Sequence, residues 1–234
     1  MCGIVGYVGM RSAQQVLLDG LEKLEYRGYD SAGVALTQRD GIRVVKSKGR
    51  LSTLRSKLEE LALPQSGCGI GHTRWATHGE PSENNAHPHC TDDRSVVAVH
   101  NGIIENYQEI REKLIKNGYT FYSDTDTEVA VKLIDHYYKK YNEGPLDAMA
   151  RAMMRIRGTY ALAVMFKDYP EEIYAARKDS PMIIGITHGE DGKEGAAYLA
   201  SDVPAILTRL SATLSGSNLH KKNYHFPTDS PSWE

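Results

Sequence analysis

A cysteine stands second in the chain, after Met1 and before the small residue Gly3. A small residue after the initiator methionine permits removal of that methionine, which leaves a thiol and a free α-amine on Cys2. An α-amine titrates near about 7.7 to 8.0, so part of it is neutral at working pH and can act as base toward the thiol. Cys2 is therefore a candidate nucleophile that needs no separate histidine, although its position alone is weak evidence.

The two other cysteines predict no such chemistry. Three cysteines without a C-x-x-C pair are too few and too oddly numbered for a disulfide framework or a zinc or redox motif. We expect Cys68 and Cys90 to be free thiols that pack as small apolar side chains.

Five polar segments interrupt otherwise apolar surroundings and could contribute to a site around Cys2. They are Glu25–Ala32 (EYRGYDSA), His72–Glu80 (HTRWATHGE), Asn84–His89 (NNAHPH), His100–Asn106 (HNGIIEN) and Ser123–Glu128 (SDTDTE).

Together with the opening MCGIVG, these segments resemble the N-terminal-nucleophile (class II) glutamine amidotransferases, and specifically the glutaminase domain of the glutamine:fructose-6-phosphate amidotransferases (glucosamine-6-phosphate synthases, isomerizing). The resemblance covers residues 2–209, and YRGYDSAG and HTRWATHGEPS are long matches to this hexosamine branch. It implies hydrolysis of L-glutamine to L-glutamate and ammonia through a Cys2 thioester, without a cofactor.

The resemblance also implies an oxyanion hole. The side-chain amide of Asn101 and the backbone N–H of Gly102 would donate to the tetrahedral intermediate, with the Cys2 amine as base acting through a water. The chemistry is consistent with these roles, because Asn followed by Gly at the end of a strand offers one side-chain donor and one accessible backbone donor where negative charge develops.

The same resemblance assigns the groups that hold glutamine. Arg74 would receive the α-carboxylate and Asp126 the ammonium, so two opposed charges would discriminate against simple amides. Thr77, His78 and Gly102 are implied as further contacts. Taken singly, Arg74 or Asp126 would be an ordinary surface charge. Asp126 also suits the first turn of a helix, and this structural role is compatible with binding the ammonium.

Three further residues have lid or supporting roles in the resemblance. Trp75 would belong to a lid that shields ammonia from water, and Arg27 would support the nucleophile from the Tyr26–Asp30 loop. His87 would lie next to the closing loop.

A metal site is not expected. No H-E-x-x-H or finger spacing is present, and although Asp124, Asp126 and Glu128 begin like a calcium loop, Val129 stands where its glycine belongs. We interpret most of the clustered histidines as a hydrogen-bonding scaffold; they are His72, His78, His87, His89 and His100.

Charge and hydropathy limit the partners. A formal charge of -2 over 234 residues leaves no basic excess for a nucleic acid backbone. No run approaches the roughly 20 apolar residues that cross a bilayer, and no signal peptide begins the chain. We expect a cytoplasmic protein whose substrate is small and polar, with neither a nucleic acid nor a membrane as partner.

Apolar or alternating runs predict the strands that position these residues. Because the later runs follow one another without an intervening helix, the strands should pair antiparallel and the fold class should be α+β. The resemblance implies the N-terminal-nucleophile hydrolase fold, a four-layer α/β/β/α sandwich of two mainly antiparallel sheets. The predicted strands are 3–8, 33–37, 43–47, 68–73, 95–100, 159–167, 172–176, 182–186 and 197–201.

Three helices have start signals of the capping-box kind, namely Ser12 with Gln15, Asn106 with Glu109, and Thr125 with Glu128. A fourth helix is expected around 146–156, where Met149 and Met153 should fill the core.

The domain organisation predicted is a glutaminase domain at 2–209 and a divergent, weakly ordered tail at 210–234, where serines and a polar Pro-containing end replace the strand pattern. The sugar-isomerase domains that would use the ammonia with fructose 6-phosphate are expected to be absent. The partner would then be a separate or missing sugar-isomerase half.

Other interpretations stay open at this point. The chain could be the glutaminase domain of another class II amidotransferase, although YRGYDSAG and the Trp75 segment speak against that. It could also be a catalytically silent glutamine-binding module, or a truncated fragment made inactive by a lost strand.

Overall fold

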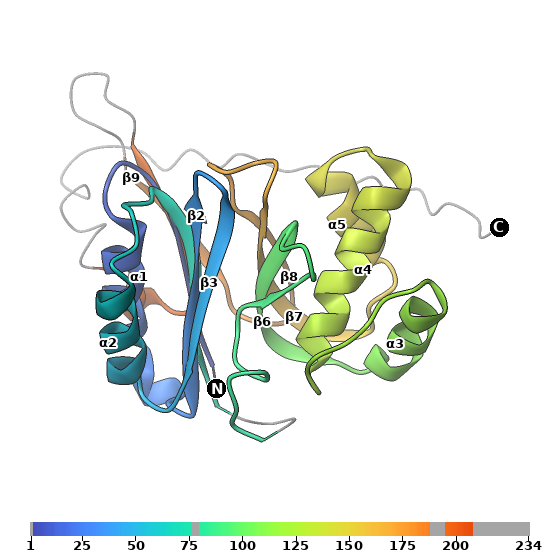
Figure 1. Cartoon of the computed structure of the whole chain (residues 1–234), viewed down its shortest axis with the longest axis horizontal. Coiled ribbons are helices and arrows are strands. Elements are labelled where there is room, and N and C mark those ends of the chain that lie inside the picture. Colours follow the sequence, from blue (N-terminus) through green and yellow to red (C-terminus); the bar gives the residue numbers. More distant parts are fainter. Residues whose placement is uncertain (1, 76–79, 188–194, 208–234) are drawn as a thin grey trace.

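The computed structural model describes residues 2–75, 80–187 and 195–207. Two antiparallel sheets lie face to face, and helices cover the outer surface of each, which makes four layers in the order α/β/β/α (Figure 1). The expected α+β class and four-layer sandwich are confirmed.

The six-stranded sheet places the start of the chain at its centre. Strand β1 (Gly3–Val8) pairs on one side with β4 (Cys68–Arg74) and on the other with β10 (Ala196–Ala200). Cys2 therefore stands directly before a central strand, where neighbouring strands limit its movement. The sheet is completed by β2 (Ser31–Gln38) and β3 (Gly41–Lys48) beyond β4, and by β9 (Ile183–Thr187) beyond β10.

The four-stranded sheet runs in the order β5, β6, β7 and β8. Its two long central strands, β6 (Val96–Ile104) and β7 (Gly158–Phe166), pair over nine residues, with Asn101 opposite Ala161. The shorter strands are β5 (His89–Cys90) and β8 (Tyr174–Lys178).

Three layers of apolar side chains hold the sandwich together. The layer between the sheets includes Ile4 and Ile70 from one sheet and Val97, Val99 and Ala161 from the other. A second layer lies under α1 (Ala13–Glu22) and α2 (Leu51–Leu61), and a third under α3 (Tyr107–Lys116), α4 (Asp126–Tyr141) and α5 (Pro145–Met153). No described helix is long and apolar enough to span a membrane.

Two of the three helix starts are confirmed in detail. The Ser12 hydroxyl accepts from the Gln15 N–H, and the Thr125 hydroxyl accepts from the Glu128 N–H, as N-cap residues do. Helix α3 does begin after Asn106, but the expected cap bond is wrong. The Asn106 side chain instead accepts from Arg157 N–H and donates to Arg155 O, which ties the start of α3 to the segment after α5.

Several elements differ from expectation. Strand β5 (His89–Cys90) was not predicted, and β8 covers Tyr174–Lys178 instead of 172–176. Helix α2 was not predicted, because no capping residue marks its start: Arg50 stands at the N-cap and makes no side-chain cap bond. The spacing of Leu51, Leu54 and Leu58 is nevertheless that of a buried helical face. Strand β6 was expected to end at His100 but continues to Ile104. The expected tail at 210–234 lies outside the described residues.

Candidate active site

Cys2 stands at the start of β1, and the next residue, Gly3, packs so closely against Leu24 and Thr73 that only glycine fits there. A Cβ on Gly3 would lie 2.7 Å from Leu24 Cβ and 2.8 Å from Thr73 Oγ1. Because Gly3 also pairs with Thr73 across β4, its small size lets β1 settle against its neighbours with Cys2 at a defined place.

The Cys2 thiol contacts the backbone of Trp75. The Trp75 N–H donates to Cys2 Sγ at 3.3 Å. Burial raises the pKa of the thiol, and the Trp75 N–H and the positive charge of Arg74 act against that rise without reversing it. A raised thiol pKa means that Cys2 needs a base to become a nucleophile at neutral pH.

Asn101 reaches Cys2 from the other sheet. Its Nδ2 donates to the Cys2 carbonyl oxygen at 3.0 Å, and its Oδ1 lies 3.0 Å from His72 Nε2. The next residue, Gly102, has φ of +135°, and a Cβ there would overlap the Thr159 carbonyl oxygen. A side chain at position 102 is therefore excluded, which explains why glycine follows Asn101.

Arg74 and Asp126 bring opposite charges to the same place. Arg74 ends β4 and is buried. Asp126 opens α4, and its Oδ2 accepts from the Ile104 N–H at 2.9 Å, with Oδ1 3.9 Å from His100 Nδ1. Neither residue is a free surface charge, and together they offer opposite charges to a ligand with one anionic and one cationic group.

A cavity joins these groups and includes most of the expected site residues. Its lining also contains His100, Thr125 and Thr127, which sequence reasoning did not assign to the site. Thr127 follows Asp126 by one residue at a helix start; the sequence marked its segment, Ser123–Glu128, but no role for Thr127 itself. The lining residues are Cys2, Arg74, Trp75, His87, His100, Asn101, Gly102, Thr125, Asp126 and Thr127.

Three expected residues are not placed in the lining. Thr77 and His78 lie outside the described residues. Arg27 does not line the cavity; its guanidinium forms an ion pair with Asp202, Nη2 to Oδ2 3.2 Å. Its loop nevertheless abuts the site, because a Cβ on Gly28 would lie 2.7 Å from the Arg74 carbonyl carbon.

Four buried histidines in and behind the cavity wall form hydrogen bonds, as the scaffold interpretation predicts. His87 Nδ1 accepts from the His100 N–H at 3.3 Å, and His100 Nδ1 lies 3.0 Å from Thr127 Oγ1. His89 contacts the Thr125 hydroxyl at 3.0 Å. Burial lowers the pKa of each ring, to about 3 for His72, so these histidines are neutral at working pH; they are His72, His87, His89 and His100.

A family comparison matches residues 72–208, more than half of the chain, to the model described as "Glutamine amidotransferase domain". The chain belongs to the glutamine amidotransferases. It is 53% identical over 208 residues to the glutamine--fructose-6-phosphate aminotransferase [isomerizing] of Clostridium acetobutylicum, with 88% of this chain and 32% of the relative covered. The corresponding protein of Caldanaerobacter subterraneus subsp. tengcongensis is 50% identical over 207 residues, again with 88% and 32% covered.

Solved amidotransferase structures are similar in fold. The glutamine phosphoribosylpyrophosphate amidotransferase of B. subtilis gives a TM-score of 0.71 at 25% identity, and a structure titled as the allosteric regulatory enzyme of purine biosynthesis gives 0.74 at 26%. Each match covers 88% of this chain and 43% of the other. This amidotransferase chain spans about a third of the length of the curated relatives it matches.

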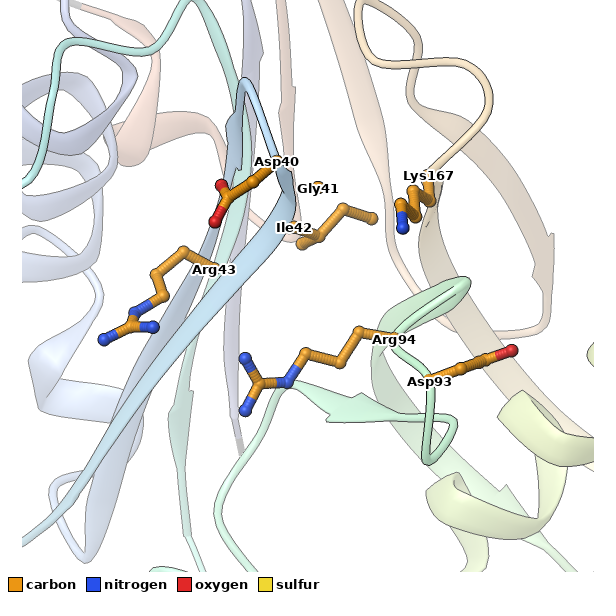
Figure 2. Close-up of a pocket in the computed structure, with 7 residues that line it drawn as sticks. All are labelled: Asp40, Gly41, Ile42, Arg43, Asp93, Arg94 and Lys167. Atoms are coloured by element: carbon orange, nitrogen blue, oxygen red, sulfur yellow. The ribbon is translucent and has the colours of Figure 1, made fainter.

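Figure 2 shows the residues that line a second hollow, of about 200 Å³, in this amidotransferase. The hollow adjoins the turn between β2 and β3, at the far end of β2 from Ser31. Ser31 pairs with Arg74, which lines the cavity. Because β2 is eight residues long, the hollow and the cavity are roughly 25 Å apart. The cations of the hollow are Arg43, Arg94 and Lys167. All three are exposed, so solvent already stabilises their charge. The distance between the two places makes this hollow separate from the candidate active site.

The described residues contain no group of three or more His, Cys, Asp or Glu side chains arranged to hold a metal ion. Cys68 and Cys90 are free thiols, as expected, and Cys68 is buried.

Proposed function

We propose that the chain hydrolyses L-glutamine to L-glutamate and ammonia through a thioester on Cys2. The observation that carries the proposal is the shared cavity. It brings together, from four separate segments, the Cys2 thiol, the Asn101 amide that donates to the Cys2 carbonyl oxygen, and the opposed charges of Arg74 and Asp126. The names of the curated relatives, glutamine--fructose-6-phosphate aminotransferases, agree with this chemistry.

The nucleophile becomes complete when Met1 is removed. The freed α-amine of Cys2 accepts the thiol proton through a water, and the thiolate forms a C–S bond with the side-chain amide carbon of glutamine. The negative charge that develops on the amide oxygen receives hydrogen bonds from Asn101 Nδ2 and the Gly102 N–H. The protonated amine returns its proton to the leaving nitrogen as the C–N bond breaks, which releases ammonia.

Water then completes the reaction. The α-amine takes a proton from a water molecule as that water attacks the thioester carbon. Asn101 and Gly102 stabilise the second tetrahedral intermediate in the same way. Collapse of the intermediate breaks the C–S bond, releases glutamate and restores the thiol of Cys2.

The charged ends of glutamine select the substrate. Arg74 pairs with the α-carboxylate and Asp126 with the α-ammonium, while Thr77 and His78 add further contacts. Trp75, at the cavity mouth and 43% exposed, acts as part of a lid. His87 forms part of the cavity wall, and Arg27 supports that wall through its loop.

In the wider pathway the ammonia would be used by a sugar-isomerase half with fructose 6-phosphate to make glucosamine 6-phosphate. Residues 2–209 form the glutaminase domain in this proposal, and 210–234 form a separate tail.

A glutaminase assay of the purified chain, with intact mass establishing that Met1 is gone, tests the proposal. We expect glutamate and ammonia in equal amounts, and little product from asparagine. Glutamine binding without turnover would identify a silent binding module and contradict the proposal. A processed, folded chain that neither binds nor hydrolyses glutamine would contradict it as well.

A further inference from the structure

His72 lies directly behind the amide of Asn101, at the junction of the two sheets. It belongs to β4, whereas Asn101 belongs to β6, and its side chain is fully buried. Its Nε2 lies 3.0 Å from Asn101 Oδ1 and 3.2 Å from the His100 carbonyl oxygen.

These neighbours determine the protonation of the ring. A backbone carbonyl oxygen only accepts hydrogen bonds, so the nitrogen facing His100 must carry a hydrogen. Burial lowers the pKa of His72 to about 3, so the ring carries one hydrogen at working pH, and that hydrogen is on Nε2. The ring of His87, stacked on His72 with centroids 4.1 Å apart, restrains the imidazole plane.

The orientation of the Asn101 amide follows from this tautomer. With Oδ1 toward His72, the amide accepts the Nε2 hydrogen and its Nδ2 donates to the Cys2 carbonyl oxygen. A flipped amide would place N–H against N–H at His72 and oxygen against oxygen at Cys2. Both ends of the amide therefore favour the orientation in which the NH₂ group faces the nucleophile.

We propose that His72 is the positioning residue that keeps the Asn101 NH₂ group turned toward Cys2, where it can stabilise the oxyanion. This role rests on the proposed glutaminase function. His72 itself touches neither the substrate nor the sulfur; it acts through Asn101.

Two amide substitutions form a matched test. In H72Q the glutamine Nε2 can occupy nearly the place of the imidazole Nε2, whereas in H72N the amide ends one bond short and cannot reach Asn101. We expect H72Q to keep kcat within about 3-fold of the parent chain and H72N to lower it about 10- to 100-fold, with the KM for glutamine nearly unchanged, because the lost stabilisation belongs to the transition state.

A double-mutant cycle separates positioning from a general structural effect. In an N101A background, H72N should change kcat by less than about 3-fold, because there is no amide left to orient. In a D126N background, H72N should cause its full loss, since Asp126 makes no hydrogen bond with His72. Alkylation of Cys2 by iodoacetamide needs no oxyanion hole and should proceed at the parent rate in H72N.

Equal losses in H72Q and H72N, or a full loss from H72N in the N101A background, would overturn the positioning role while leaving the glutaminase function intact. A parent chain without glutaminase activity would overturn the proposed function and this role together. An H72N chain that does not fold shifts the test to H72Q. There, a loss above about 10-fold in a folded chain would contradict the role, and near-parent kcat would support it.

Discussion

The Asn101 Nδ2 donates a 3.0 Å hydrogen bond to the carbonyl oxygen of Cys2 and thereby connects strand β6 of one sheet to the start of β1 in the other. The proposed nucleophile and the side-chain amide proposed to stabilise the oxyanion are thus contributed by different layers. Their alignment depends on the apolar layer between the sheets, where Ile4 and Val99 are both buried. Catalysis should therefore be sensitive to how these two sheets pack.

Removing the Asn101 side chain should lower kcat without abolishing binding. In N101A we expect about a 100- to 1,000-fold lower kcat for glutamine hydrolysis, because one preorganised donor to the oxyanion is lost, and a much smaller change in KM. Steady-state kinetics with glutamine gives both values. N106A is the matched control, since the Asn106 side chain likewise makes two hydrogen bonds, here both to backbone groups, but lies outside the cavity lining; it should lose stability and keep kcat. Parent-like kcat in N101A would contradict the oxyanion assignment.

Neutralising Asp126 should weaken glutamine binding. D126N keeps an oxygen that can accept from the Ile104 N–H but removes the charge proposed to face the ammonium. We expect KM for glutamine to rise about 10- to 100-fold, in line with the loss of a charged hydrogen bond, with a smaller effect on kcat. Asp124, two residues earlier and outside the cavity lining, supplies the control D124N. An unchanged KM in D126N would mean that the ammonium binds elsewhere.

The buried histidines predict loss of stability in mild acid. Burial holds the pKa of His72 at about 3 and those of His87 and His89 well below 6.5 in the folded chain, whereas in the unfolded chain they titrate near about 6.5. Below that pH the unfolded state binds protons that the folded state cannot, so the free energy of unfolding falls as the pH falls. The stabilisation is complete above about pH 7 and is lost progressively toward pH 3.

Urea unfolding at pH 7.5, 6.5 and 5.5 measures this dependence. His72 alone should contribute a decrease of roughly 1.4 kcal/mol for each pH unit below about 6.5, and H72Q should show a shallower decrease than the parent chain. A free energy of unfolding that is constant from pH 7.5 to 5.5 would contradict the neutral, buried state of these rings.

A buried ion pair should stabilise the segment that leads into Asp126. Lys132 Nζ lies 2.8 Å from Glu128 Oε1, with side chains 1% and 0% exposed. The Glu128 carboxylate also accepts from the backbone N–H groups of Tyr122 and Ser123. In K132M the carboxylate is left buried without its cation, so the free energy of unfolding should fall by about 3–5 kcal/mol.

The control is the pair formed by Lys113 and Glu109, which has the same i,i+4 spacing but is exposed, at 70% and 54%. K113M should hardly change stability. Chemical denaturation of both variants makes the comparison. Equal effects of K132M and K113M would show that burial does not determine the strength of the inner pair.

These two pairs also show what sequence could not predict. The sequence has a lysine four residues after a glutamate in both helices. In the structure Phe121 and Tyr122 pack against Lys132, and this pair lies inside the protein. Charge spacing thus identified neither which pair is buried nor its role in holding the start of α4.

The strands were more predictable, because alternating or apolar runs such as Gly3–Val8 carry their own period of two. Periodicity does not say which strands pair, however, so the four-layer arrangement came from the family resemblance. The contact between His72 and Asn101 joins positions 29 residues apart on different sheets, and its direction depends on a ring tautomer. Strand β6 extends beyond the predicted end at His100, where Asn101 and Gly102 read as a stop signal.

The central claim, that Cys2 is the nucleophile, is tested most directly by comparing the parent chain with C2A, both with Met1 removed as established by intact mass. Glutamate release from glutamine should be measured in each, with rapid acid quenching of the parent chain to trap the intermediate. We predict that C2A releases no glutamate above background, and that the quenched parent carries one added glutamyl group on the Cys2 peptide. Equal rates of glutamate release in the two chains would contradict the assignment.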